Sequence, residues 1–280
     1  MPEPKFQISI AAWSVHRMFF AKEIDQLGMV DLCHDLGIGA FEMVNTFFPS
    51  PQYGYLKQLR KRADDAGVKL LLIMCDAEGS MAGPEKASRM LAAKNHHKWV
   101  DIAAVLGCQS IRCNTGAQDG DPDAQDRCAE SFSALLEYAD ASGIDLLIEN
   151  HGGLSSDPDW LAGLMKKVDH PRFGTLPDFG NFPDTTDRYD AIRKLMPYAK
   201  AVSAKCYDFD AAGNETKIDF AKMMKIVDDA GYRGYVDIEY EGERLPEREG
   251  IIACKALLER FQRSEIRGQR SEILSTGSDL

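Results

Sequence analysis

The feature that most constrains the fold is a short apolar run followed by a longer amphipathic stretch, a unit that repeats eight times along the chain. Apolar residues at consecutive positions are typical of parallel strands that are covered on both faces. We predict strands at 7–13, 40–45, 69–76, 110–114, 145–151, 174–180, 199–205 and 234–242.

The amphipathic stretches between these runs are predicted to be helices. They lie near 28–36, 52–66, 84–106, 124–142, 158–168, 187–196, 218–230 and 246–262. Glycine, which readily takes the left-handed conformation that ends a helix, follows five of them. These glycines are Gly37, Gly67, Gly107, Gly143 and Gly231. Strict alternation of strand and helix predicts a parallel sheet, and eight units predict closure into a single (β/α)8 TIM barrel.

The length of 280 residues agrees with this fold, since such barrels typically need roughly 250 residues. No GxGxxG follows the first predicted strand, so the usual sign of a dinucleotide-binding open sheet is missing. We therefore predict one barrel domain over 1–263 and a polar C-terminal tail over 264–280.

Composition excludes several partners. A net charge of −11 argues against nucleic acid, which is bound through clustered Lys and Arg. No apolar stretch reaches the roughly 18 residues of a membrane span, and the first residues do not resemble a signal peptide. Seven irregularly spaced cysteines predict buried thiols rather than a disulfide framework, as in a cytoplasmic protein. A small sugar is the expected partner, and packing of the tail on a second copy, as in a homo-oligomer, stays open.

Polar residues occur at the ends of nearly all eight predicted strands, where the active site of such a barrel lies. Polar groups are costly to bury unpaired, so the set predicts a shared polar cavity. The alternative for any single residue is a helix cap or a salt-bridge partner. We predict that five of them contact the substrate: His16, Glu42, Asn114, His151 and Asn181. For His16 and His151 a purely structural hydrogen bond remains the alternative.

Three acidic residues near the ends of strands five, six and eight form the sharpest subset: Glu149, Asp178 and Glu239. Clustered carboxylates repel one another unless a cation or a proton compensates. A divalent metal with oxygen ligands would do so, and the set predicts such a metal site. The alternative is that the three are isolated caps.

Several motifs resemble the sugar phosphate isomerase/epimerase family with the xylose-isomerase-like barrel. They are IENHGG (148–153), LPDFGNF (176–182), VSAK (202–205) and DIEYEG (237–242), with AAWSVHR (11–17), FEMVNTFF (41–48), LLIMCDAEG (71–79) and LGCQSIRCN (106–114). The similarity spans nearly the whole chain up to about residue 262. It is specific for the superfamily and does not define the sugar.

The resemblance implies a metal held by Glu, Asp, His and Glu on strands five to eight. Glu149, Asp178 and Glu239 match the first, second and fourth ligands. The third does not match, because Ser203 stands where the family often has His, and a hydroxyl is a much weaker ligand. The expected cofactor is therefore Mn²⁺ or Mg²⁺, rather than Zn²⁺, with water or substrate oxygen completing the site.

The chemistry that the resemblance implies is isomerisation or epimerisation by proton transfer through an enediolate. A carboxylate on one face of the sugar removes the proton and one on the other face returns it, roles that we assign to Glu149 and Glu239. Lys205 is expected to stabilise the developing oxyanion.

Two other functions stay open. A lyase acting on a keto-sugar or glycoside would begin with the same proton abstraction, and a catalytically silent sugar-binding barrel would explain the missing His. An apurinic endonuclease of the same superfamily would need several zinc-binding histidines and a basic surface. The chain has six His and a strongly negative charge, which argue against that function.

Overall fold

All eight apolar runs form strands. The structure is a computed structural model and describes residues 4–262, so the predicted tail at 264–280 lies outside the described residues. The strands are β1 (Gln7–Ala11), β2 (Ala40–Val44), β3 (Lys69–Cys75), β4 (Ser110–Cys113), β5 (Asp145–Glu149), β6 (Phe173–Leu176), β7 (Val202–Cys206) and β8 (Tyr235–Tyr240). They form one parallel sheet in the order β6-β5-β4-β3-β2-β1-β8-β7.

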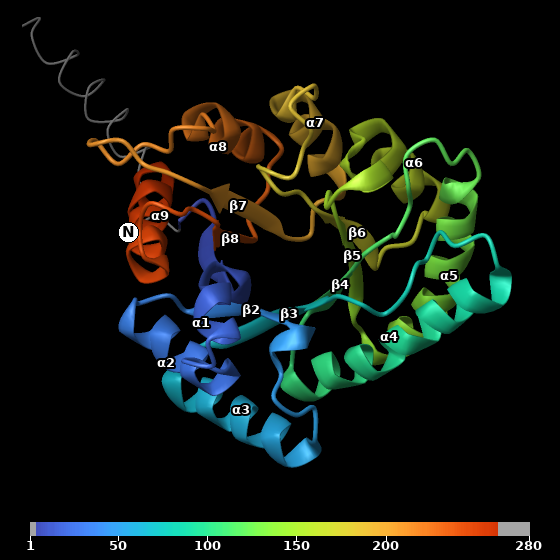
Figure 1. Ribbon diagram of the computed structural model, residues 1–280, viewed down its shortest axis with the longest axis horizontal. Coiled ribbons are helices and arrows are strands. Elements are labelled where there is room, and N and C mark those ends of the chain that lie inside the picture. Colours follow the sequence, from blue (N-terminus) through green and yellow to red (C-terminus); the bar gives the residue numbers. More distant parts are fainter. Residues whose placement is uncertain (1–3, 263–280) are drawn as a thin grey trace, which may run out of the picture.

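The sheet closes on itself between β6 and β7. Parallel bridges join Thr175 to Ala199 and Asp178 to Ser203. Pro177 has no N–H and cannot donate to the ladder, but its carbonyl accepts from the Ser203 N–H at 2.9 Å. This proline explains why β6 ends at Leu176 rather than continuing to residue 180 as predicted. The predicted (β/α)8 TIM barrel is confirmed, with its strands at the centre and helices around them (Figure 1).

The helices of the described residues surround the barrel and match the predicted stretches, with one addition. They are α1 (His16–Phe20), α2 (Gln26–Asp35), α3 (Tyr53–Ala66), α4 (Lys86–Leu106), α5 (Ala124–Ser142), α6 (Pro158–Val168), α7 (Arg188–Leu195), α8 (Phe220–Asp229) and α9 (Glu247–Gln262). The short α1 was not predicted. The five predicted glycines all have positive φ, between 62° and 77°. No helix within residues 4–262 combines the length and apolarity of a membrane span.

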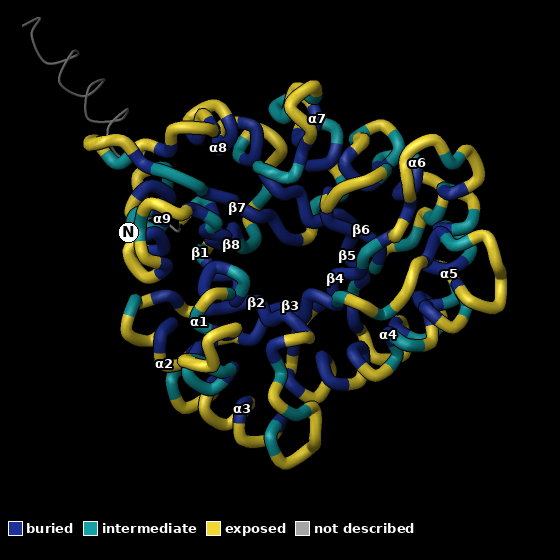
Figure 2. The backbone as a smooth tube through the Cα atoms, viewed as in Figure 1, coloured by how far each residue is buried: buried dark blue, intermediate teal, exposed yellow. Residues whose placement is uncertain are grey.

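Burial follows the layers of the barrel, with the strands buried and the outer faces of the helices exposed (Figure 2). A disulfide joins Cys206 on β7 to Cys254 on α9, and the sequence did not predict this pair. The other five cysteines are buried thiols, as expected, whereas the Cys206–Cys254 pair departs from that expectation.

Pairing of β7 with β8 determines which side chains face the barrel interior. Ser203 pairs with Asp237, and Lys205 pairs with Glu239. Side chains two positions apart on a strand share a face, so these four polar residues lie on the same face of the sheet. Their neighbours Ala204 and Ile238 face the helices and are fully buried. The register thus directs a row of polar groups into the barrel.

Candidate metal and active site

Three buried carboxylates meet at the C-terminal end of the barrel. Glu149 is the last residue of β5, Asp178 lies two residues beyond β6, and Glu239 is the penultimate residue of β8. One carboxylate oxygen from each lies within 4.8 Å of the others, and all three side chains are buried. We call this set the carboxylate triad. The sequence prediction that these three residues meet at one place agrees with this geometry.

Asp178 is held in place from both sides of its backbone. The Asn150 side chain donates to the Asp178 carbonyl at 2.9 Å and accepts from the Asp178 N–H at 2.8 Å. Oδ1 of Asp178 accepts from the backbone N–H groups of Gly180 and Asn181, both at 2.7 Å. Oδ2 has no hydrogen-bond partner although the residue is fully buried. The sequence analysis missed Asn150. Its place directly after Glu149, between two residues that were selected, was the signal that could have identified it.

Glu149 is bound by an amide and a guanidinium. Its Oε1 accepts from Asn181 Nδ2 at 2.8 Å. Its Oε2 lies 3.0 Å from Arg112 Nε, close enough for an ion pair but not aligned for a hydrogen bond. Arg112 Nη1 also contacts Asp76 at 2.8 Å and Asn114 Oδ1 at 2.9 Å. The sequence analysis missed Arg112, although a buried arginine within an apolar strand was a visible signal.

Glu239 is bound by groups from the neighbouring strand β7. Lys205 Nζ lies 3.0 Å from Oε1, and Ser203 Oγ donates to Oε2 at 3.2 Å. The same ammonium donates to Asn181 Oδ1 at 2.8 Å and lies 3.7 Å from Asp178 Oδ2. Lys205 therefore connects two members of the carboxylate triad.

Space for the Lys205 side chain depends on Gly180. A Cβ at that position would lie 2.7 Å from Lys205 Cδ and 2.5 Å from the Tyr207 hydroxyl. Any larger residue would displace the lysine stem from its path to the triad. The Asp-Phe-Gly-Asn segment that follows β6 thus supplies a carboxylate, room for the lysine, and the amide of Asn181.

Acidic groups outnumber the basic groups in contact with them. Arg112 pairs with Asp76 and Glu149, whereas Lys205 pairs with Asp178, Glu239 and Glu241. Two cations therefore compensate five carboxylates. Further positive charge or proton uptake would relieve the remaining repulsion.

The pKa values in the triad reflect this imbalance. Burial raises the pKa of Glu149 to about 7 despite the nearby Arg112 guanidinium. Burial also raises the pKa of Asp178 to about 7, with Lys205 opposing. For Glu239, burial acts in the same direction, but the Lys205 ammonium outweighs it and the pKa is lowered. The two glutamates therefore differ in proton affinity although both are buried.

A second acidic layer lies below the triad inside the barrel. Glu42 on β2 accepts from Ser9 Oγ at 3.3 Å through Oε1, and its Oε2 has no hydrogen-bond partner. Burial raises the pKa of Glu42 to about 8, and the charges of Glu239 and Glu149 add to the shift. Neither carboxylate oxygen of the fully buried Asp237 has a hydrogen-bond partner. Glu42 thus lies near the triad but is enclosed within the barrel.

The other predicted substrate contacts separate into two groups. Asn181 lies between Glu149 and Lys205, and Asn114 binds the Asp76 carboxylate beside Arg112. His151 is partly exposed. Desolvation and the Arg112 charge lower its pKa, and the Glu239 charge opposes them.

His16 is placed differently. It stacks on Trp13 with ring centroids 5.0 Å apart, and its Nδ1 lies 2.8 Å from the Trp13 carbonyl. Trp13 in turn donates to Glu241, and this aromatic neighbour links His16 to the site.

The residues of the triad fit a divalent cation. Hard cations prefer carboxylate oxygens, and Asp178 Oδ2 is a buried oxygen that lacks a hydrogen-bond donor. Glu149, Asp178 and Glu239 would hold the ion. Ser203 Oγ already donates to Glu239, so it helps to orient one of the residues that would hold the ion.

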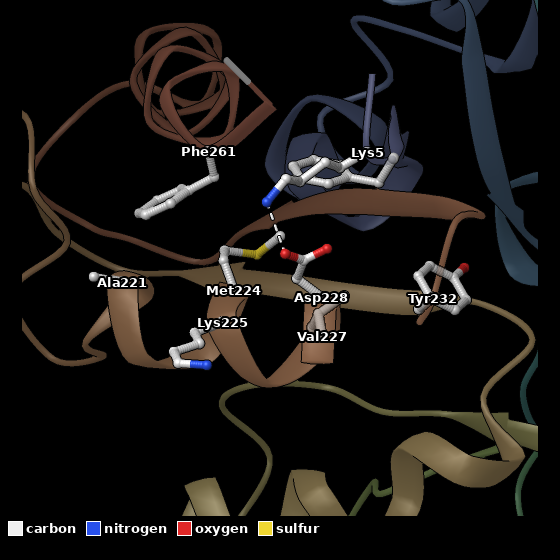
Figure 3. A pocket seen from close by; sticks show the side chains of 9 residues that line it. Lys5, Ala221, Met224, Lys225, Val227, Asp228, Tyr232 and Phe261 are labelled. Carbon is white, nitrogen blue, oxygen red and sulfur yellow. Dashed lines mark hydrogen bonds and ion pairs between the residues drawn. The ribbon is translucent and has the colours of Figure 1, made fainter. Parts of the chain in front are cut away.

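A separate cavity of about 230 Å³ lies at the other end of the barrel, before β1 and between α8 and the end of α9 (Figure 3). Lys5 pairs with Asp228 there at 2.7 Å, next to Met224 and Phe261. No member of the carboxylate triad lines it, so this cavity is distinct from the candidate active site.

Comparison with known proteins shows which family the chain belongs to. The model of the xylose isomerase-like TIM barrel matches residues 30–260. The chain belongs to this family. A protein from Mus musculus named as a hydroxypyruvate isomerase is 25% identical over 244 residues, which cover 76% of this chain and 84% of that protein.

Two solved structures show the same fold at low sequence identity. An L-ribulose 3-epimerase superposes with a TM-score of 0.76 at 16% identity, covering 98% of this chain and 100% of the other. A 3-keto-D-glucoside 4-epimerase from E. coli superposes with a TM-score of 0.72 at 12% identity, covering 91% and 99%. These two similarities concern the fold, and the family model confirms the predicted xylose-isomerase-like barrel.

Proposed function

We propose that this protein is a divalent-metal-dependent isomerase or epimerase of a small sugar, acting by proton transfer through an enediolate. The observation that carries the proposal is the buried carboxylate triad, in which two glutamates with different cationic partners converge with Asp178. The names of the relatives, among them sugar epimerases and an isomerase, support the same class of reaction.

The proposed cofactor is Mn²⁺ or Mg²⁺, because the ligand set is all oxygen and lacks the imidazole that favours Zn²⁺. Glu149, Asp178 and Glu239 are its proposed ligands. When bound, such an ion polarises a carbonyl and the adjacent hydroxyl and lowers the cost of enediolate formation.

The proton is moved by the two glutamates. Glu239, kept ionised by Lys205, is suited to remove a proton from the carbon next to the carbonyl. Glu149, on the other side of the triad, returns a proton to the enediolate. Lys205 donates toward the oxygen on which negative charge develops. Asn181, His151 and Asn114 are proposed to contact the hydroxyl groups of the sugar.

The test is solvent exchange in deuterated water. Ketoses and aldoses are incubated with the protein after removal of divalent ions and after addition of Mn²⁺ or Mg²⁺. We expect metal-dependent incorporation of deuterium at the carbon next to the carbonyl, measured by NMR. Metal-dependent loss of a water or alcohol group from the sugar would support a lyase instead. Sugar binding with no exchange under either condition would contradict the proposed enzyme.

A further inference from the structure

A groove of about 470 Å³ lies beside the carboxylate triad, between the loops that follow β5 and β6. Its lining includes Asp119, Asp157, Asn181, Phe182 and Thr186. The volume is within the roughly 300–1,000 Å³ of small-molecule sites. The proposed proton transfer uses none of these residues except Asn181.

Asn181 lies between the groove and the triad and forms the wall that separates them. Its side chain donates to Glu149 and accepts from Lys205, both at 2.8 Å. Its backbone carbonyl accepts from Ser156 Oγ at 2.7 Å, and Ser156 also lines the groove. The wall is therefore fixed on both sides. A ligand with its reacting carbon on the triad reaches the groove by extending past this one residue.

The lining has the chemistry of a carbohydrate site. Asp119 and Asp157 offer carboxylates that accept from hydroxyl groups, and Thr186 offers a hydroxyl. Phe182 and Pro183 supply an apolar surface for the C–H face of a sugar ring. No Lys, Arg or His is among the described residues that line the groove. A phosphate would meet two negative charges there, whereas a neutral polyol would meet acceptors for its hydroxyls.

The cations nearest the triad are already engaged by protein carboxylates. Arg112 binds Asp76 and Glu149, and Lys205 binds three acidic residues. Two further cations, Arg188 and Lys217, lie near Tyr207 and do not line the groove. Charge in this region therefore favours a neutral extension of the substrate over a phosphorylated one.

We propose that the groove binds the non-reacting sugar ring of a glycoside whose carbonyl-bearing unit lies on the triad. The proposal rests on the proposed function for the reacting end and adds the class of substrate: a neutral glycosyl-substituted keto-sugar rather than a sugar phosphate.

The test compares fructose, fructose 6-phosphate and glucosyl-fructoses linked through O3, O5 or O6. Binding is measured by saturation-transfer NMR, and solvent exchange is measured in deuterated water with Mn²⁺. We expect at least one glucosyl-fructose to bind better than fructose and fructose 6-phosphate. Thr186→Trp, which fills the groove, should lower the preference for that disaccharide over fructose by about tenfold, the scale of losing apolar and hydroxyl contacts in a pocket.

Thr185→Trp is the matched control. Thr185 is exposed on the same loop and does not line the groove, so the preference should remain. Preference for fructose or fructose 6-phosphate, or equal effects of the two tryptophans, would overturn the glycoside groove while solvent exchange still supported the proposed function. Groove-dependent binding of a disaccharide without exchange would support the groove and overturn the proposed reaction. Absence of both binding and exchange would overturn both.

Discussion

The two glutamates of the triad approach the same centre from different strands, Glu149 from β5 and Glu239 from β8, and their surroundings differ. Glu149 is held by Arg112 on β4, and that guanidinium is shared with Asp76. Glu239 is held by Lys205 and Ser203 on β7. The ammonium of Lys205 also approaches Asp178, whereas the ion pairs of Arg112 within the triad involve Glu149 alone.

This difference shows that two buried carboxylates a few ångströms apart need not be equivalent. Arg112 contacts Glu149 but does not overcome the cost of burial, and the pKa of Glu149 is raised. Lys205 overcomes that cost at Glu239, whose pKa is lowered. One carboxyl is therefore suited to release a proton near neutral pH and the other to accept one.

The largest expected effect comes from neutralising either glutamate. Glu239→Gln keeps the shape of the side chain but removes the base, and it should lower solvent exchange into the sugar by about 10²–10⁴-fold, the usual contribution of a general base. Glu149→Gln should lower it less, because the raised pKa of Glu149 leaves it partly protonated near neutral pH and so less available as the base that starts exchange. The rates are measured by deuterium incorporation.

Glu241→Gln serves as the control for this pair, since Glu241 contacts Lys205 but lies outside the triad. Circular dichroism should show an intact fold for all three variants. Full exchange activity in Glu239→Gln would show that Glu239 is not the proton carrier.

A smaller effect is expected from removing the two cations. Lys205→Met removes the ammonium that pairs with Asp178 and Glu239, so these carboxylates no longer have a competing cation. The change should tighten Mn²⁺ binding by about tenfold, or ~1.4 kcal/mol. Arg112→Met should change the affinity less, because Arg112 contacts one proposed ligand rather than two. Isothermal titration of metal-stripped protein gives both values. Weaker Mn²⁺ binding by Lys205→Met than by the native chain would contradict this account of how Lys205 acts on the triad.

The last effect is on stability alone and concerns the acidic layer below the triad. Glu42 has a pKa raised from 4.5 to about 8 by burial, so its contribution to stability is complete below the unfolded value near 4.5 and is lost as pH rises to about 8. Glu42→Gln keeps an acceptor for Ser9 and carries no charge. It should be more stable than the native chain at pH 9, by on the order of 1–3 kcal/mol.

At pH 5 the stabilities of Glu42→Gln and the native chain should be nearly equal. Urea unfolding at both pH values measures the difference. A stability difference independent of pH would show that Glu42 does not titrate in the folded protein as its burial implies.

The sequence predicted much of this arrangement because the signals are local. Unbroken apolar runs and glycine-capped amphipathic stretches gave the order of the elements, and positions such as Glu149 at a strand end gave the triad. Two of the errors were also local in origin: Pro177 shortened β6 by removing a donor, and α1 is too short to show a clear period. Arg112 was missed because its partners come from other strands.

Periodicity, strand ends and glycine positions, all written in the chain, determined the barrel and the gathering of three carboxylates at one end. Only the tertiary structure decided which cation serves which carboxylate, that Glu42 and Asp237 are enclosed below them, and that Asn181 separates the triad from a groove. The reason is physical. Residue spacing defines which face a side chain occupies, but strand register and side-chain conformation define which atoms from distant segments come within bonding distance.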